Sequence, residues 1–169
     1  MISTFNPWTP FDRLVLRYLG WKAQWSRAIA GRYQTERKSI PAFDSVEELE
    51  MYRRDRFRYR NDPMFGLLDY YQHPEHLMVT QAGDCDCQAV WVYKALQSMF
   101  DHRAEIVTIV SPVVWKNHVF CAITRPDGRL CSIDTRGLHE HQDRSDMLAF
   151  YNRAFKTRFR AYPTSYPFE

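Results

Sequence analysis

Apolar residues at helical spacing alternate along the chain with short runs rich in β-branched residues, which indicates a mixture of helices and strands. From residue 11 to about residue 30, leucine, tryptophan and isoleucine recur at helical intervals, and Pro10 suits a first turn, so we predict a helix there. Ser45 opens a capping-box-like Ser-Val-Glu-Glu, which predicts a second helix over residues 45 to about 60. The region 63–74 contains two prolines and a glycine and is predicted to be rich in loops.

The second half of the chain has a sharper pattern. Apolar residues between Ala89 and Phe100 form one core-facing stripe, which predicts a central helix over 85–100. β-branched and apolar residues then predict strands at 105–110, 113–115, 118–124 and 130–134, with a hairpin turn at Pro126-Asp127-Gly128. Ser145 is expected to cap a last helix over 146 to about 157, before a proline-interrupted tail. This order predicts an α+β fold, with the central helix packed on an antiparallel sheet.

The composition is that of one globular domain. The chain has 169 residues, of which 45% are hydrophobic and 25% charged, enough to bury a core without metal or disulfide support. Five tryptophans, ten tyrosines and 11 phenylalanines favour a core or cleft lined by aromatic rings. No repeat or Gly/Ser linker divides the sequence, so we expect a single domain over residues 1–169.

The net charge and the first residues of the chain limit the partners and the compartment that we expect. The formal net charge is only +3, and the arginines of residues 52–60 are better explained as a solvated helix face than as a nucleic-acid site. The first residues lack a secretory signal, and no window reaches transmembrane length, so we expect a cytoplasmic or intravirion setting without a membrane partner. The four cysteines are then expected to be reduced thiols. The oligomeric state stays open.

Candidate chemistry begins at Gly83-Asp84-Cys85-Asp86, where the central helix is expected to start. Gly83 permits a sharp turn and Asp84 can cap the helix, which places the Cys85 thiol at the helix N-terminus. Aligned backbone dipoles there favour the thiolate, and free amide donors can hold an oxyanion. Burial and the carboxylates of Asp84 and Asp86 would raise the thiol pKa instead, so activation requires a nearby histidine.

His118 and Asp134 supply the remaining groups, and hairpin parity shows whether they can meet. A three-residue turn puts Phe120 opposite Asp134, with His118 two residues away on the same face. A turn two residues longer puts His118 directly opposite Asp134, and only an odd register shift would separate the faces. Cys121 and Cys131 alternate to the other face and are expected in the core.

These three residues suggest an acyl-transfer mechanism. Cys85 attacks an acyl carbon, His118 takes the thiol proton and returns it to the leaving amine, and Asp134 fixes the histidine tautomer. A thioester forms, which water or a primary amine then resolves, and the sequence leaves that choice open. Gln81, as an oxyanion donor, and Trp115 are further candidates for lining the site.

The motif Gly83-Asp84-Cys85-Asp86, followed by a helix and by His118-Val and Asp134 on successive strands, resembles the transglutaminase-like cysteine peptidases of bacteria and their phages. The resemblance covers roughly residues 80–137, with a helical flank at 1–79 and a C-terminal helix and tail at 138–169. It implies a papain-like or transglutaminase-like core in which Cys85 is the nucleophile, His118 the base and Asp134 its orienter. Family members often have an acidic residue and an aromatic where this chain has Cys87 and Gln88.

Three function classes are considered. The first hypothesis is an enzyme that acts on a protein or peptide substrate without a metal or organic cofactor. The second is a non-catalytic structural or interaction module, such as a virion or assembly component, that keeps the scaffold. The third is a zinc module using Cys85, Cys87 and a histidine, although no regular histidine–cysteine spacing supports it. We expect Cys87 to pack in the core and His73, His76, His139 and His141 to lie in surface loops.

Overall fold

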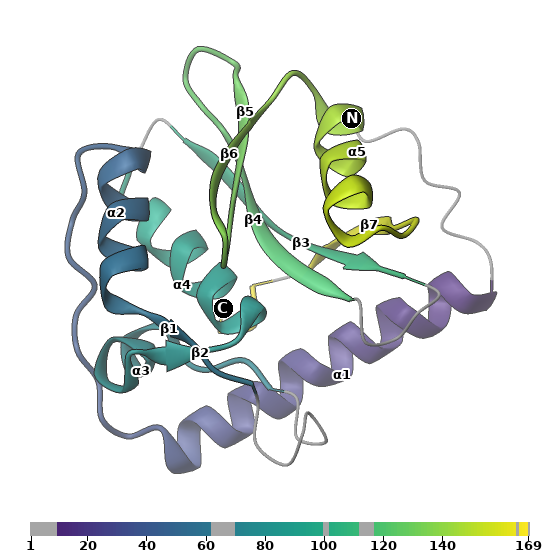
Figure 1. Ribbon diagram of the computed structural model, residues 1–169. Coiled ribbons are helices and arrows are strands. Elements are labelled where there is room, and N and C mark those ends of the chain that lie inside the picture. The colour runs from purple at the N-terminus through teal and green to yellow at the C-terminus, as the bar shows by residue number, and fades with distance from the viewer. Residues whose placement is uncertain (1–9, 62–69, 100–101, 112–116, 165, 169) are drawn as a thin grey trace.

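The computed structural model describes residues 10–61, 70–99, 102–111, 117–164 and 166–168. Its centre is a five-stranded antiparallel sheet in the order β6-β5-β4-β3-β7 (Figure 1). The strands are β3 (Arg103–Val110), β4 (His118–Thr124), β5 (Leu130–Asp134), β6 (Gly137–His141) and β7 (Arg160–Thr164). The helices are α1 (Pro10–Tyr33), α2 (Val46–Arg56), α3 (Pro74–Thr80), α4 (Cys85–Leu96) and α5 (Arg144–Phe155). A short parallel pair joins β1 (Arg58–Tyr59) to β2 (Ala82–Gly83).

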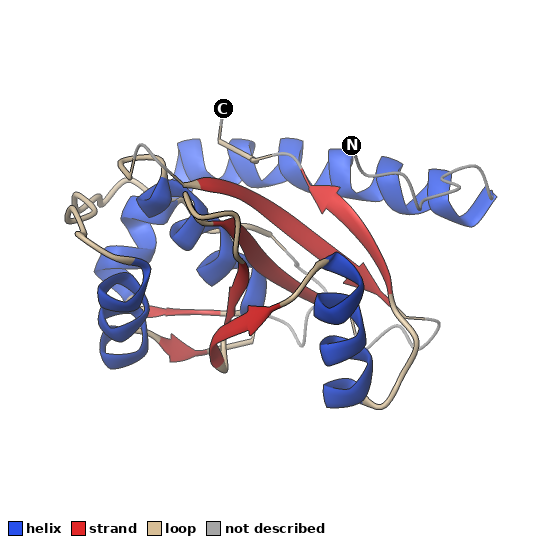
Figure 2. Cartoon of the chain, turned by 90° about the horizontal axis from the view of Figure 1, so that it is seen from above, coloured by secondary structure: helices blue, strands red, loops and turns tan. Residues whose placement is uncertain are grey.

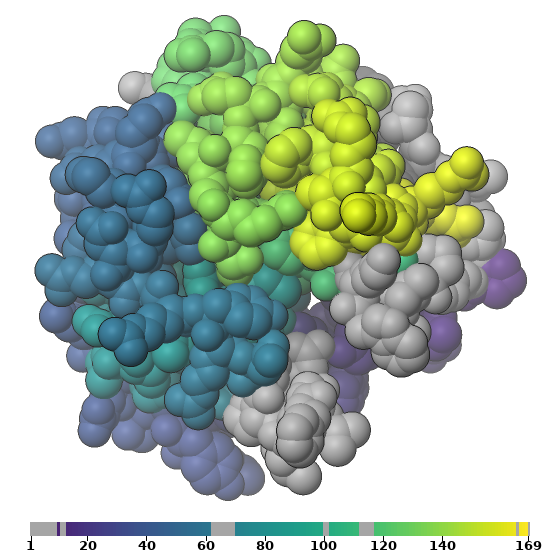
Figure 3. Space-filling view, viewed as in Figure 1, coloured from purple at the N-terminus to yellow at the C-terminus, as the bar shows by residue number. Residues whose placement is uncertain are grey.

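Helices cover both faces of the sheet, because β3, β4 and β5 are apolar on both sides. On one face, α4 packs the fully buried Trp91 near Cys121, Ile123 and Ile133. On the other face, α5 packs Met147 and Tyr151 against Val107, Phe120 and Ala122. In the space-filling view, α5 and β6 cover the strands on the side that faces the viewer (Figure 3). The predicted α+β fold, with a central helix on an antiparallel sheet, is confirmed.

The long helix α1 lies beside the strands (Figure 2). Val15 and Leu19 pack against Val110 of β3 and Tyr162 of β7. Farther along the helix, the Ser26 hydroxyl accepts a hydrogen bond of 2.8 Å from the Tyr71 backbone amide. These contacts place one side of α1 against the end of β3 and the middle of β7. Within the described residues, none of the helices combines the length and the apolar character that crossing a membrane requires.

The hairpin register agrees with the three-residue turn. The Arg125 amide donates to the Arg129 carbonyl at 2.9 Å, and the Gly128 amide donates to the Arg125 carbonyl at 2.9 Å. Cys121 pairs with Ile133, which is the register that puts His118 and Asp134 on the same face. Cys121 and Cys131 lie in the core on the opposite face, as parity predicts.

Several boundaries differ from the predicted ones. Ser45 caps α2 as expected, accepting from the Glu48 amide, but α2 ends at Arg56 because the chain continues into β1. α4 ends at Leu96, four residues short of the predicted end at residue 100. The cap of α5 is Asp143 rather than Ser145, since the Asp143 carboxylate accepts from the Asp146 amide at 2.8 Å.

Five elements were not predicted, namely α3, β6, β7 and the short strands β1 and β2. Pro74 begins α3 instead of a loop, because proline fits the first turn of a helix and His73 caps it. β6 forms by pairing with β5 and β7 by pairing with β3, where Pro163 is tolerated in a strand at the sheet edge. The strand predicted at 113–115 lies outside the described residues.

Candidate active site

Cys85 is the first residue of α4, where the sequence predicts it. The Asp84 side chain caps the helix by accepting from the Cys87 amide at 3.2 Å. Gly83 is required by close packing: a Cβ at this position would lie 2.8 Å from the Cβ of Cys87 and 3.0 Å from Leu77. A bulkier residue at 83 would push the start of α4 away from α3.

The surroundings of Cys85 disfavour a standing thiolate. The side chain is half-buried, and burial followed by the carboxylates of Asp84 and Asp86 raises the pKa of the thiol well above its ordinary value. A hydrogen bond from the backbone of Val119 and the charge of Lys22 act in the opposite direction on the same pKa. The helix dipole alone therefore does not ionise the thiol, and a base must remove its proton.

His118 and Asp134 form a buried pair. His118 Nε2 lies 3.0 Å from Asp134 Oδ2, and the two residues are 6% and 4% exposed. Arg136 donates to the same carboxylate through its backbone amide at 2.8 Å and its guanidinium at 2.8 and 3.0 Å, and His139 Nε2 lies 3.3 Å from Oδ1. Burial raises the pKa of Asp134, but the hydrogen bonds from His118, His139 and Arg136 outweigh it, so the pKa is lowered well below its usual range. The carboxylate is charged and holds Nε2.

Cys85 and His118 meet as walls of one pocket of about 250 Å³. Val119, whose backbone bonds the Cys85 sulfur, directly follows His118 on β4. The structure shows no hydrogen bond between the described Cys85 and His118 side chains. With Nε2 engaged by Asp134, Nδ1 is the ring nitrogen left for a thiol proton. The ring is also packed by Phe155 and Tyr151, at centroid distances of 5.1 and 5.8 Å.

The other candidate positions fare differently. Gln81 is the left-handed C-cap of α3, with φ of 52°, and its exposed side chain does not line the pocket. Trp115 lies outside the described residues. The expectation that His139 and His141 lie in surface loops is wrong: both belong to β6, and His141 is buried against the Ser132 hydroxyl at 2.8 Å. His73 caps α3 and is half-buried.

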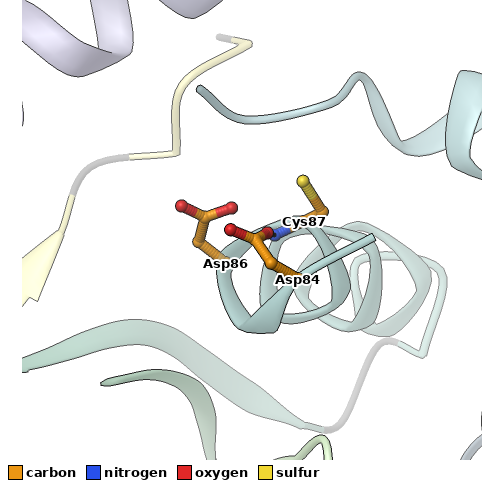
Figure 4. A group of neighbouring side chains, drawn as sticks. All are labelled: Asp84, Asp86 and Cys87. Atoms are coloured by element: carbon orange, nitrogen blue, oxygen red, sulfur yellow. Dashed lines mark hydrogen bonds between the residues drawn. The ribbon is translucent and has the colours of Figure 1, made fainter. Parts of the chain in front are cut away.

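Asp84, Asp86 and Cys87 form a group whose possible ligand atoms lie within 4.8 Å of one another (Figure 4). Each of these atoms already serves the fold. Asp84 caps α4, the buried Cys87 sulfur accepts from the Gln72 amide at 3.3 Å, and Asp86 bonds the ammonium of Lys22. The group includes no histidine, so within the described residues it does not match the zinc module considered above. We assign it no metal.

Two residues of the site were not anticipated. Lys22 of α1 lines the pocket, and its only sequence signal is a lysine on the predicted core face of a helix, between Leu19 and Ser26. Arg136 follows Asp134 by two residues, in the turn before β6, and it is not part of the site predicted from the sequence. A larger cavity of about 460 Å³, between α5 and the sheet, is lined by neither Cys85, His118 nor Asp134.

No family model matches the chain, and no curated protein matches it. Among solved structures, LapG of Legionella pneumophila in its calcium-bound form is 20% identical, with a TM-score of 0.47 over 78% of this chain and 79% of that one. Two further LapG structures, one of them EGTA-treated, are 18% identical at the same TM-score, covering 79% of this chain and 77% and 76% of theirs. Similarity at this level concerns only the overall path of the chain.

Proposed function

We propose that this protein catalyses cysteine-dependent acyl transfer, and that it hydrolyses an amide or isopeptide bond of a protein or peptide, as a transglutaminase-like cysteine peptidase would. The observation that carries the proposal is the buried His118–Asp134 pair, whose imidazole shares a pocket with the half-buried Cys85. A carboxylate that orients a histidine beside a thiol is the arrangement that nucleophilic acyl transfer requires.

The geometry supports the following roles. Asp134 accepts a hydrogen bond from the Nε2–H of His118, which leaves Nδ1 able to take the thiol proton as the sulfur attacks the carbonyl carbon. Because the thiol pKa is raised, this transfer accompanies the attack instead of preceding it. The tetrahedral intermediate expels the amine, which receives the proton from His118, and a Cys85 thioester remains. A water molecule then attacks the thioester carbonyl. His118 takes a proton from this water and gives it to the departing Cys85 sulfur, which restores the thiol.

A non-catalytic scaffold is the second candidate, favoured by two observations. No hydrogen bond links Cys85 to His118, and the thiol pKa is raised by burial and two carboxylates. A catalytic contact is often long without a substrate and tightens only in the complex, so the present geometry is compatible with both functions. Amine transfer instead of hydrolysis has no observation of its own in its favour.

Alkylation of the native protein by iodoacetamide across pH tests the Cys85–His118 coupling. Cys85 should be the single rapidly labelled thiol, because Cys87, Cys121 and Cys131 are fully buried. Because His118 can take the thiol proton, alkylation of Cys85 should continue to lower pH in the wild type than in His118→Ala, where the thiol has no such base. Cys85→Ala, with an unchanged far-UV spectrum, should lose the label. Identical pH profiles for wild type and His118→Ala would remove the proposed base.

Turnover itself is tested with a pool of unmodified peptides followed by mass spectrometry. The wild type should release new amine ends, and hydroxylamine should capture the acyl group of the Cys85 thioester as a hydroxamate. Cys85→Ala should do neither. Adding a fluorescent primary amine separates the two acceptors, since incorporation of the amine in place of hydrolysis would identify a transglutaminase. A selectively labelled Cys85 without any turnover would favour the scaffold.

A further inference from the structure

Lys22 is a buried cation on the wall of the candidate active site. It lies on α1 and is 4% exposed, and its ammonium forms an ion pair with Asp86, the residue that follows Cys85. The same ammonium lies 4.6 Å above the centroid of the Tyr71 ring. A lysine 64 positions before Asp86 in the sequence is therefore held beside the nucleophile by contacts from two other segments.

Anchoring of α1 does not require this pair. Ser26 links the helix to Tyr71 through its hydroxyl, and Leu19, Ala23 and Ala30 are buried on the same side. A buried ion pair commonly contributes less to stability than apolar residues of similar volume, because both charges lose their hydration. A lysine at this position is thus better explained by what its charge does than by packing.

The charges that face Cys85 explain what Lys22 does. Asp84 and Asp86 come from its own helix, Lys22 comes from α1, and His118 comes from β4. Without Lys22, a developing thiolate would lie beside two carboxylates with no fixed positive charge among these four groups. Lys22 compensates Asp86 and acts on the sulfur through space, an interaction strengthened by burial.

We propose that Lys22 is a positioning residue of the active site, which fixes the Asp86 side chain and supplies the positive charge that a Cys85 thiolate requires. Helix α1 is then a functional wall of the pocket, in addition to covering the ends of the strands. This inference rests on the proposed function, in which Cys85 is the nucleophile.

The pH profile of Cys85 alkylation in native protein tests the proposal. Lys22→Met keeps the length of the side chain and removes its charge, so the midpoint should move up by about one pH unit. Below the midpoint this corresponds to alkylation about tenfold slower. Lys22→Arg keeps the charge and should stay near the wild-type midpoint. Arg17→Met, an exposed position on the same helix, is the matched control and should leave the profile unchanged.

Lys22→Met removes the ion-pair partner of the buried Asp86, so a second pair of variants covers a failure to fold. Asp86→Asn should lower the midpoint, since it removes one of the two carboxylates beside the sulfur while the charge of Lys22 remains. Adding Lys22→Met to Asp86→Asn should raise it again. Changes in melting temperature without any change in midpoint, in either background, would show a structural role only and overturn the proposal.

The same experiment separates this inference from the proposed function. Alkylation needs no turnover, so a midpoint shift in Lys22→Met supports the role of Lys22 even when no peptide is cleaved. Conversely, a protein whose profile responds to His118→Ala but not to Lys22→Met retains the proposed base and loses the inference about α1.

Discussion

The two halves of the candidate site are built in opposite ways. The base half comes from one hairpin and the turn after it, where the Asp134 carboxylate is surrounded by donors and its pKa is lowered. The nucleophile half comes from the start of α4 and from α1, where the Cys85 thiol faces carboxylates and its pKa is raised. The Asp134 carboxylate is therefore charged in the resting protein, whereas the surroundings of Cys85 disfavour a charged thiolate. This difference favours a proton transfer to His118 during attack over a permanent thiolate–imidazolium pair.

Removing the charge of the base half should have the largest effect. In Asp134→Asn the amide cannot stabilise an imidazolium and favours the wrong histidine tautomer, so turnover of the best-cleaved peptide should fall on the order of a hundredfold or more. The matched control is Asp127→Asn, at the exposed turn of the same hairpin, which should retain wild-type turnover. Equal activity of Asp134→Asn and wild type would show that the base half does not depend on this charge.

Weakening the same half without removing its charge should have a moderate effect. Arg136 donates to Asp134 while its guanidinium lies 4.7 Å from the centroid of Phe155. Arg136→Met keeps the apolar contact and removes the side-chain donors, so kcat should fall about tenfold with little change in KM. Arg129→Met, which removes an exposed arginine that contacts Asp127, serves as the control. A change in KM alone would instead assign Arg136 to substrate binding.

The contrast between the halves also explains how far the sequence predicts the site. The pairing of His118 with Asp134 follows from the alternation of side chains along two strands joined by a short turn, and the observed register has that parity. Cys85 at a helix start follows from the Gly83-Asp84 cap. Both are local features, for which hydrophobic period and turn chemistry are sufficient.

Contacts between segments far apart in the chain were missed. The placement of Lys22 against Asp86 depends on how α1 packs on the sheet, which no local pattern specifies. One nearby element was missed as well: β6 follows β5 directly, but it has little β-branched character and forms because β5 offers it a paired edge, after a turn that ends at Gly137, whose φ of 141° suits glycine. β7 likewise depends on an edge of β3 some 50 residues earlier in the chain.

The smallest expected effect concerns stability in acid. Asp134 titrates below its ordinary pKa of 3.8 in the folded protein, so its contribution to the free energy of unfolding is present above that pH and is lost as the pH falls below it. Asp134→Asn should therefore flatten the decline in unfolding free energy between about pH 5 and pH 2, measured by urea titration.

Asp127→Asn removes a fully exposed carboxylate whose pKa is also lowered, and solvent screening should make its effect weaker. The Cys85 thiol should not contribute in this range, because its pKa is raised and it stays neutral there. Equal flattening by the two aspartate variants would mean that the buried Asp134 contributes no more to the free energy of unfolding in acid than the exposed Asp127 does.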